Sequence, residues 1–154
     1  MSVYVAPNRA GVCRILIAED DPDDQFLAQG AFEQTDENVD VTFVEDGQAL
    51  IDHLCARVYN GDGDGMPDLL LVDINMPRKN GREAILEIKS HKDLRHIPII
   101  AYSTSNFSGE VQFLYQIGAN SFVVKPNSFE GWITTLDAIL KYWFRIVELP
   151  RAKV

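Results

Sequence analysis

The sequence has little cysteine and no long apolar run. Its two cysteines, Cys13 and Cys55, are too few for a disulfide framework. Both fall among apolar residues, which is typical of small buried side chains in a reducing compartment. No stretch of about 18 apolar residues occurs, and no charged segment followed by an apolar one opens the chain. We therefore expect a cytoplasmic protein without a membrane segment.

Positive charge is also scarce. The 154 residues include 14 Lys and Arg against 23 Asp and Glu, which gives a net charge of -9. This excess of acid, without a Lys/Arg cluster to receive phosphates, argues against nucleic-acid binding. With 46% hydrophobic and 24% charged residues, the chain is typical of one soluble globular domain with a sizeable core. We expect a loosely ordered arm at 1–12, the domain at 13–147 and a tail at 148–154.

Short apolar segments alternate with helical patterns along the whole domain. The segments expected to form strands are 14–18, 39–44, 69–72, 97–102 and 121–124. Such alternation with short connections requires crossover helices and a parallel sheet that is covered on both faces. The predicted fold is α/β, a flavodoxin-like (βα)5 three-layer sandwich whose five parallel strands lie in the order 2-1-3-4-5.

Capping residues indicate where several helices begin. Asp21, followed by proline, and Asp46, followed by glycine, are typical of N-caps. Asn127 and Glu130 stand at the spacing of a capping box, which predicts that the last helix starts with them.

Three side chains on helical stripes allow two interpretations each. His53 is expected to be a packed residue rather than a ligand. Trp143 and Phe144 come late on the last helix, where they either pack in the core or form a homodimer or partner surface.

Segment 60–65 is rich in Asp and Gly but departs from the EF-hand template, because the position of the bidentate Glu is Leu71. We expect it to be a flexible loop.

The residues best suited to chemistry stand where the predicted strands end. Glu19 and Asp20 follow the first strand, Asp73 ends the third, Ser103 the fourth and Lys125 the fifth. Because the carboxyl ends of parallel strands share one edge of a sheet, these side chains are expected to converge.

Three carboxylates in one pocket repel one another, and a hard divalent cation relieves that repulsion. Mg2+ fits better than Ca2+, because few protein ligands are offered and waters can complete the shell. A carboxylate beside the cation can attack phosphorus to form an aspartyl phosphate. The metal and the Lys125 ammonium would neutralise charge on the phosphoryl oxygens, and the Ser103 hydroxyl would bond the phosphoryl group.

Four segments taken together are more specific than any single residue. They are 15–21 (Ile-Leu-Ile-Ala-Glu-Asp-Asp), 70–77 (Leu-Leu-Val-Asp-Ile-Asn-Met-Pro) with Asn80-Gly81, 98–103 (Pro-Ile-Ile-Ala-Tyr-Ser) and 118–126 (Gly-Ala-Asn-Ser-Phe-Val-Val-Lys-Pro). As an ordered set they resemble the receiver domain of a two-component response regulator, and the likeness covers about residues 13–145.

The resemblance implies a role for each site residue. Asp73 would be the phosphoacceptor. Glu19 and Asp20 would hold Mg2+ together with Asp73, and the backbone carbonyl of Asn75 would complete the protein ligands.

The resemblance also places the switch residues. Ser103 falls at the family's switch Ser/Thr, Lys125 at its invariant lysine and Phe122 at its aromatic switch position. Phe122 has no hydroxyl, so it can report burial but cannot donate a hydrogen bond. The Lys125-Pro126 peptide bond is expected to be cis.

A partner and an output follow from the same resemblance. A sensor histidine kinase would phosphorylate Asp73, and the chain is similar to stand-alone regulators found beside bacterial phytochromes. We expect no attached effector, because only residues 148–154 follow the last helix. Signalling would then use a conformational switch with protein docking or phosphorelay. Apart from slow loss of its own phosphate, we expect no enzyme activity.

Three other classes of protein fit the residues less well. A phosphohydrolase of the haloacid dehalogenase type needs a second Asp two residues after the nucleophile, and that position is Asn75. A flavodoxin-like nucleotide or flavin binder would want a phosphate loop after the first strand, where the acidic segment 19–21 repels phosphate. A receiver unable to take phosphate is disfavoured, because every required side-chain type is present.

Overall fold

The structure is a computed structural model that describes residues 12–61 and 65–150 of the chain. Within these residues, five strands alternate with five helices. The strands are β1 (Cys13–Ala18), β2 (Val39–Val44), β3 (Leu69–Asp73), β4 (Ile99–Ser103) and β5 (Ser121–Val124). The helices are α1 (Pro22–Glu33), α2 (Gly47–Tyr59), α3 (Gly81–Ser90), α4 (Ser108–Gln116) and α5 (Phe129–Lys141), and a π-helical turn, η2 (Tyr142–Ile146), follows α5.

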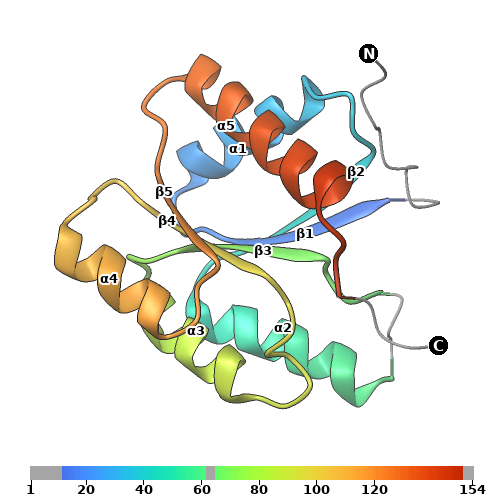
Figure 1. Ribbon diagram of the computed structural model, residues 1–154, viewed down its shortest axis with the longest axis vertical. Coiled ribbons are helices and arrows are strands. Elements are labelled where there is room, and N and C mark those ends of the chain that lie inside the picture. Colours follow the sequence, from blue (N-terminus) through green and yellow to red (C-terminus); the bar gives the residue numbers. More distant parts are fainter. Residues whose placement is uncertain (1–11, 62–64, 151–154) are drawn as a thin grey trace.

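Neighbouring strands pair in parallel, in the order β2-β1-β3-β4-β5. Helices α1 and α5 cover one face of the sheet, and α2, α3 and α4 cover the other (Figure 1). The α/β sandwich and the strand order predicted from the sequence are therefore confirmed. The order reverses between β1 and β3, and this reversal opens the crevice in which open α/β sheets bind ligands.

Two apolar clusters fill the space between the sheet and its helices. All residues of β3 and β4 are buried. Successive side chains alternate between the faces, so Leu70 and Val72 join the cluster under α2, α3 and α4, while Leu71 joins the cluster under α1 and α5. Burial on both faces explains why these strands have almost continuous apolar sequences.

The predicted N-caps of two helices are confirmed. The Asp21 carboxylate accepts a hydrogen bond from the backbone N–H of Asp23, and Pro22 is the first residue of α1. The Asp46 carboxylate accepts one from the N–H of Ala49 at the start of α2, at 2.8 Å. Both carboxylates satisfy amide groups that the first helical turn leaves unpaired.

The predicted start of the last helix was wrong by one residue. Ser128 is the N-cap of α5, because its backbone is extended and its hydroxyl accepts a hydrogen bond from the N–H of Gly131 at 3.0 Å. With that amide already satisfied, Asn127 stands outside the helix and forms no capping box with Glu130. A capping box is present instead at the start of α3, between Asn80 and Glu83.

The end of α5 packs against the body of the domain. Trp143 and Phe144 are half-buried and contact the cluster under α1 and α5. Arg145 forms an ion pair with Glu37, in the connection between α1 and β2. Leu149, within the predicted tail, is also buried. Core packing of the two aromatic residues is therefore observed, and the alternative of a homodimer surface stays a prediction.

Several predicted segments lie wholly or largely outside the described residues. They are the arm at 1–12, the last residues of the tail and residues 62–64 of the loop that follows α2. Among the helices of residues 12–61 and 65–150, none combines the length and the apolar character that crossing a membrane demands.

Candidate functional site

The carboxyl ends of three strands bring the predicted acidic residues and Lys125 together. Glu19 and Asp20 follow β1, and Asp73 is the last residue of β3. Each offers a carboxylate oxygen, and these oxygens lie within 4.8 Å of one another. Lys125 directly follows β5 and reaches the same place. The site lies at the edge of the sheet that is on the left in Figure 1.

Asp73 is held from both sides. Its Oδ1 accepts a hydrogen bond from the backbone N–H of Asn75 at 3.0 Å, and its Oδ2 lies 3.1 Å from the Lys125 Nζ. The loop after β3 closes tightly behind it, where the Gly81 N–H bonds the carbonyl of Ile74 at 3.0 Å. A Cβ on residue 81 would lie 2.4 Å from the Asp73 carbonyl oxygen, so only glycine fits there.

Lys125 is surrounded by carboxylates. Its Nζ lies 2.7 Å from Glu19 Oε1, 2.8 Å from Asp24 Oδ2 and 3.1 Å from Asp73 Oδ2, and its side chain is only 8% exposed. Burial alone would lower the pKa of Lys125, but the hydrogen bonds and charges of Asp24, Glu19 and Asp73 outweigh it and raise that pKa. The Lys125 ammonium therefore stays charged and offsets part of the repulsion among the three carboxylates.

Glu19 is buried and fully engaged on one oxygen. Its Oε1 accepts hydrogen bonds from the Tyr102 hydroxyl at 2.9 Å and from Lys125, while its Oε2 accepts one from the backbone N–H of Asp21 at 3.1 Å. Burial, followed by the contact with Asp73, raises the pKa of Glu19 to about 7. A second positive charge in the pocket would favour its carboxylate form.

Ser103 lies at the border of the acidic site. Its side chain is fully buried, and its hydroxyl oxygen accepts hydrogen bonds from Asn75 Nδ2 at 3.4 Å and from the Ser105 N–H at 3.2 Å. Since Asp73 pairs in register with Tyr102, Ser103 extends one residue beyond the phosphoacceptor candidate on the next strand. The chain thus brings Ser103 and Asn75 together beside Asp73.

Phe122 lies on β5, away from the acidic residues. Its side chain is half-buried and packs against the cluster under α2, α3 and α4. It pairs in register with Ala101, whose side chain belongs to the same cluster, and Ser103 stands two residues further on the same strand. Ser103 and Phe122 therefore share one face of the sheet. The backbone N–H of Phe122 donates to the Tyr115 hydroxyl of α4 at 3.2 Å.

Two residues of the site escaped the sequence analysis. Asp24, in the first turn of α1, forms an ion pair with Lys125, and Tyr102 bonds Glu19. For Tyr102 a signal existed: it is a hydroxyl-bearing residue within an apolar buried strand, and a buried tyrosine usually bonds a partner. Asp24 gave no such signal, because acids are common in the first turn of helices for reasons of the helix dipole.

The predicted cis bond before Pro126 is not observed. No peptide bond in the described part of the chain is cis, so the Lys125-Pro126 bond is trans. The trans form is favoured for a bond before proline, and Lys125 reaches Glu19, Asp24 and Asp73 in that form.

The donor set suits a divalent cation of the Mg2+ type. Glu19 and Asp73 are buried, Asp20 is exposed, and all three offer the oxygen ligands that hard cations take. The ammonium of Lys125 faces three carboxylates, those of Glu19, Asp24 and Asp73, and one positive charge does not neutralise them. The residues present therefore fit a cation, with room for water on the exposed side of Asp20.

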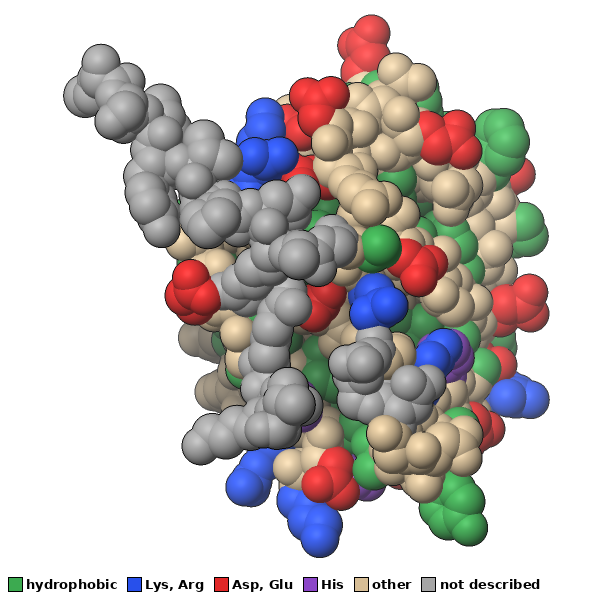
Figure 2. All heavy atoms as spheres, turned by 90° about the vertical axis from the view of Figure 1, so that its right-hand side faces the viewer, with side chains coloured by type: hydrophobic (Ala, Val, Ile, Leu, Met, Phe, Trp, Pro, Cys, Tyr) green, Lys and Arg blue, Asp and Glu red, His purple; other side chains and the backbone are tan. Residues whose placement is uncertain are grey.

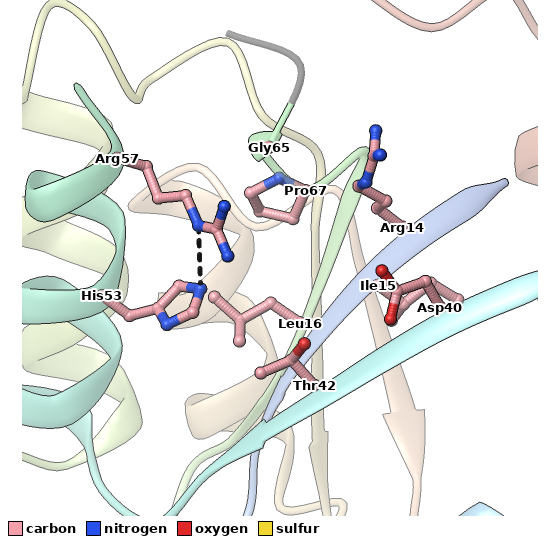
Figure 3. A pocket seen from close by; sticks show the side chains of 9 residues that line it. All are labelled: Arg14, Ile15, Leu16, Asp40, Thr42, His53, Arg57, Gly65 and Pro67. Carbon is pink, nitrogen blue, oxygen red and sulfur yellow. Dashed lines mark hydrogen bonds between the residues drawn. The ribbon is translucent and has the colours of Figure 1, made fainter. Parts of the chain in front are cut away.

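A separate hollow lies at the opposite end of the sheet. It is lined by side chains of β1, β2 and α2 together with Gly65 and Pro67 (Figure 3). His53 is half-buried there, and its Nε2 lies 3.5 Å from the Arg57 Nε. Burial, followed by the charge of Arg57, lowers the pKa of His53. The acidic residues of the sheet's other edge take no part in this hollow.

Together, the five parallel strands and the acidic pocket with its lysine define a receiver. Residues 15–137 match the family model of the response regulator receiver domain, and the chain belongs to this family. Receivers are signalling domains that accept phosphate rather than enzymes.

Particular relatives are similar over most of their length. The probable methanogenesis regulatory protein FilR2 of Methanothrix harundinacea is 33% identical over 129 residues, which are 84% of this chain and 82% of that protein. The response regulator Rcp1 of a Synechocystis species is 29% identical over 138 residues, 90% of this chain and 93% of that one.

Solved structures agree with these relatives. The phosphorylated cyanobacterial phytochrome response regulator RcpA has a TM-score of 0.82 and 28% identity, covering 91% of this chain and 99% of that one. The Mn2+-bound form of Rcp1 has a TM-score of 0.77 and 28% identity, covering 89% of this chain and 98% of that one.

Proposed function

We propose that Asp73 accepts a phosphoryl group from a sensor histidine kinase in a Mg2+-dependent reaction. The observation that carries this proposal is the position of the Asp73 carboxylate, which lies 3.1 Å from the Lys125 ammonium and has an oxygen within 4.8 Å of carboxylate oxygens of Glu19 and Asp20. The candidate nucleophile Asp73, the ammonium of Lys125 and a set of possible metal ligands thus meet at the carboxyl ends of neighbouring strands.

The transfer exchanges one bond for another. An oxygen of the ionised Asp73 carboxylate attacks the phosphorus of the kinase's phosphohistidine, and the new O–P bond forms as the P–N bond breaks. The electron pair of the broken bond stays on the imidazole nitrogen. Lys125 is already 3.1 Å from Asp73 Oδ2, so its ammonium is in place to neutralise charge on the phosphoryl oxygens.

Glu19, Asp20, Asp73 and the backbone carbonyl of Asn75 would hold Mg2+. When bound, the cation supplies charge neutralisation for the phosphoryl oxygens and for the crowded carboxylates. The Mn2+-bound form of Rcp1 supports a divalent cation in a similar receiver. The choice of Mg2+ rests on the small number of protein ligands offered here.

Ser103 and Phe122 form the proposed switch. On phosphorylation, the Ser103 hydroxyl would leave Asn75 and move toward the phosphoryl group, and Phe122 would turn inward to fill the space vacated. Because the Phe122 backbone is bonded to Tyr115 of α4, this movement would reach the surface formed by α4, β5 and α5. The altered surface would then dock partner proteins, or the phosphoryl group would be passed on in a relay.

The type of kinase is inferred from similar response regulators. RcpA is a phytochrome response regulator, and its similarity supports a kinase of the phytochrome type as the partner of this chain. We further propose a receiver at residues 13–147 between an arm at 1–12 and a tail at 148–154, acting in the cytoplasm without binding nucleic acid or a membrane.

A homodimer through the last helix is the remaining partner proposal. Trp143 and Phe144 are half-buried, so each keeps some surface for a second copy. Light scattering of the double variant Trp143→Ala/Phe144→Ala tests this proposal. A loss of dimer mass with a preserved fold supports the interface, whereas an unchanged mass with lower stability assigns both residues to the core.

Phosphorylation by a small-molecule donor tests the main proposal. The protein is incubated with acetyl phosphate and Mg2+, and its intact mass is measured. One added phosphoryl group is expected with Mg2+ and none with a chelator or in the Asp73→Asn variant. Addition of a phosphoryl group both in the presence of the chelator and in the Asp73→Asn variant would contradict the proposal.

The alternatives are less well supported. A haloacid dehalogenase-type hydrolase would want an acid at position 75, where the side chain is the amide that bonds Ser103. A nucleotide or flavin binder would place phosphate against the acidic residues that follow β1.

A further inference from the structure

Tyr102 carries a buried hydroxyl in β4, one residue before Ser103. It is 4% exposed, and its hydroxyl donates a hydrogen bond to Glu19 Oε1 at 2.9 Å. The two residues are 83 positions apart in sequence: Tyr102 lies on β4, and Glu19 directly follows β1, which does not pair with β4. The contact therefore joins β4 to the acidic end of β1 across the intervening strand β3.

This hydrogen bond settles which Glu19 oxygen remains available. Each carboxylate oxygen has two acceptor positions. Tyr102 and Lys125 both donate to Oε1, and the Asp21 N–H donates to Oε2. Three of the four acceptor positions are thus occupied, and the one left is on Oε2. A cation that meets Glu19 directly finds that oxygen free to bind.

The tyrosine ring is itself held in place. Its edge contacts Trp132 of α5, with the ring centroids 6.2 Å apart and the planes at 82°. The Lys125 Nζ lies 5.2 Å from the ring centroid, a favourable position for a cation over an aromatic face. A ring packed on two sides gives its hydroxyl one direction in which to donate.

We propose that Tyr102 is a positioning residue for the divalent cation: its hydroxyl fixes the rotation of the Glu19 carboxylate so that Oε2 faces the metal. This inference rests on the proposed function, since it requires the acidic site to bind a cation. Tyr102 itself does not touch the metal and acts only through Glu19.

Removing the hydroxyl has a defined consequence. In Tyr102→Phe the ring keeps its contacts with Trp132 and Lys125, but Oε1 keeps only the ammonium as a partner, and the carboxylate gains freedom to rotate. Loss of a hydrogen bond that orients a metal ligand typically costs about tenfold or more in affinity. We expect the dissociation constant for Mg2+ to rise about tenfold.

Calorimetric titration of the full chain with Mg2+ tests this expectation. Tyr59→Phe is the matched control, because it makes the same chemical change at a residue that is 91% exposed on α2. Circular dichroism of each variant checks the fold. A roughly tenfold weaker affinity in Tyr102→Phe alone supports the proposal, whereas an affinity within twofold of the wild type, or a tighter one, overturns it.

A double-mutant cycle separates positioning from a general structural effect. If Tyr102 acts through Glu19, adding Tyr102→Phe to Glu19→Gln should change the Mg2+ affinity by less than about twofold. If Tyr102→Phe weakens Mg2+ binding tenfold in the Glu19→Gln protein as well, Tyr102 acts by another route. That result would overturn the proposal even if the single variant Tyr102→Phe binds Mg2+ weakly.

The Mg2+ titration distinguishes failure of the proposed function from failure of the role of Tyr102. If the wild type itself does not bind Mg2+, the proposed function fails. If the wild type binds Mg2+ and Tyr102→Phe binds it equally well, only the role of Tyr102 fails.

Discussion

The two ends of the same sheet carry charge in different ways. At the carboxyl end, Glu19 and Asp73 are 1% and 4% exposed, and a single ammonium stands between them. At the amino end, the hollow in Figure 3 is lined by two basic residues, Arg14 and Arg57, and by the acidic residue Asp40. On the face of Figure 2, acidic and basic side chains are interspersed where they are visible.

The burial of charged groups distinguishes the acidic site from the hollow at the amino end. Charges at the amino end are half-buried or exposed, so water screens them and no ligand is needed to balance them. Glu19, Asp73 and Lys125 at the carboxyl end are removed from water, and the charges there are mostly negative, so a cation stabilises them strongly. The acidic carboxyl end of the sheet is therefore the candidate site for chemistry.

The largest expected effect comes from removing the central ammonium. Lys125→Met should lower the free energy of unfolding by about 3 kcal/mol in a chelator, because it leaves buried carboxylates without their partner. Mg2+ should restore part of this loss by binding the folded state. Urea unfolding with and without Mg2+ measures both.

The control for Lys125 is a lysine at the surface. Lys141 pairs with Asp137 and is 60% exposed, so Lys141→Met should leave the free energy of unfolding nearly unchanged. Similar losses in the two variants would remove the distinction drawn between buried and exposed charge.

The next effect concerns the loop behind Asp73. Gly81→Ala should destabilise the fold by about 2 kcal/mol, because its Cβ would collide with the Asp73 backbone. Gly109→Ala is the matched control, since its Cβ would meet only the flexible side chain of Phe107. Thermal unfolding distinguishes them, and an unchanged melting temperature in Gly81→Ala would contradict the close approach.

A smaller effect is expected at Asp24. Asp24→Asn should lower the free energy of unfolding by about 1 kcal/mol, because Lys125 loses one charged partner and keeps two. Asp23→Asn makes the same change at the exposed neighbouring residue and should cost less. If denaturant unfolding gives the same loss for both, Asp24 contributes only through the helix dipole.

The smallest effect is a pH dependence at the amino end. The folded protein lowers the pKa of His53 from 6.5 through burial and the Arg57 charge, so folding favours neutral imidazole. This contribution is complete above pH 6.5 and is lost as the pH falls, because the unfolded chain binds the proton first. The wild type should therefore lose slightly more stability on acidification than His53→Gln. Equal losses in urea unfolding would contradict the assignment.

The sequence predicts the framework because periodicity reports burial and strand ends report position. Strand order, the meeting of Glu19, Asp20, Asp73 and Lys125, and the caps at the starts of α1 and α2 all follow from such local rules. The cap of α5 did not, because adjacent Asn127 and Ser128 are both good caps and the choice depends on which residue first becomes helical.

Contacts across the sheet are beyond local rules. That Tyr102 donates to Glu19, or that Asp24 turns toward Lys125, depends on side-chain directions on elements far apart in sequence. The peptide before Pro126 is a similar case, since the two isomers differ little in free energy and the surrounding fold decides between them.

Mapping the phosphorylated residue tests the central claim most directly. The protein is treated with acetyl phosphate and Mg2+, the acyl phosphate is reduced with borohydride, and the resulting homoserine is located by peptide mass spectrometry. The account predicts homoserine at position 73 and nowhere else, and only when Mg2+ is present. Homoserine at Asp20 or another aspartate, the corresponding five-carbon alcohol at Glu19, or formation of homoserine in a chelator would contradict the account.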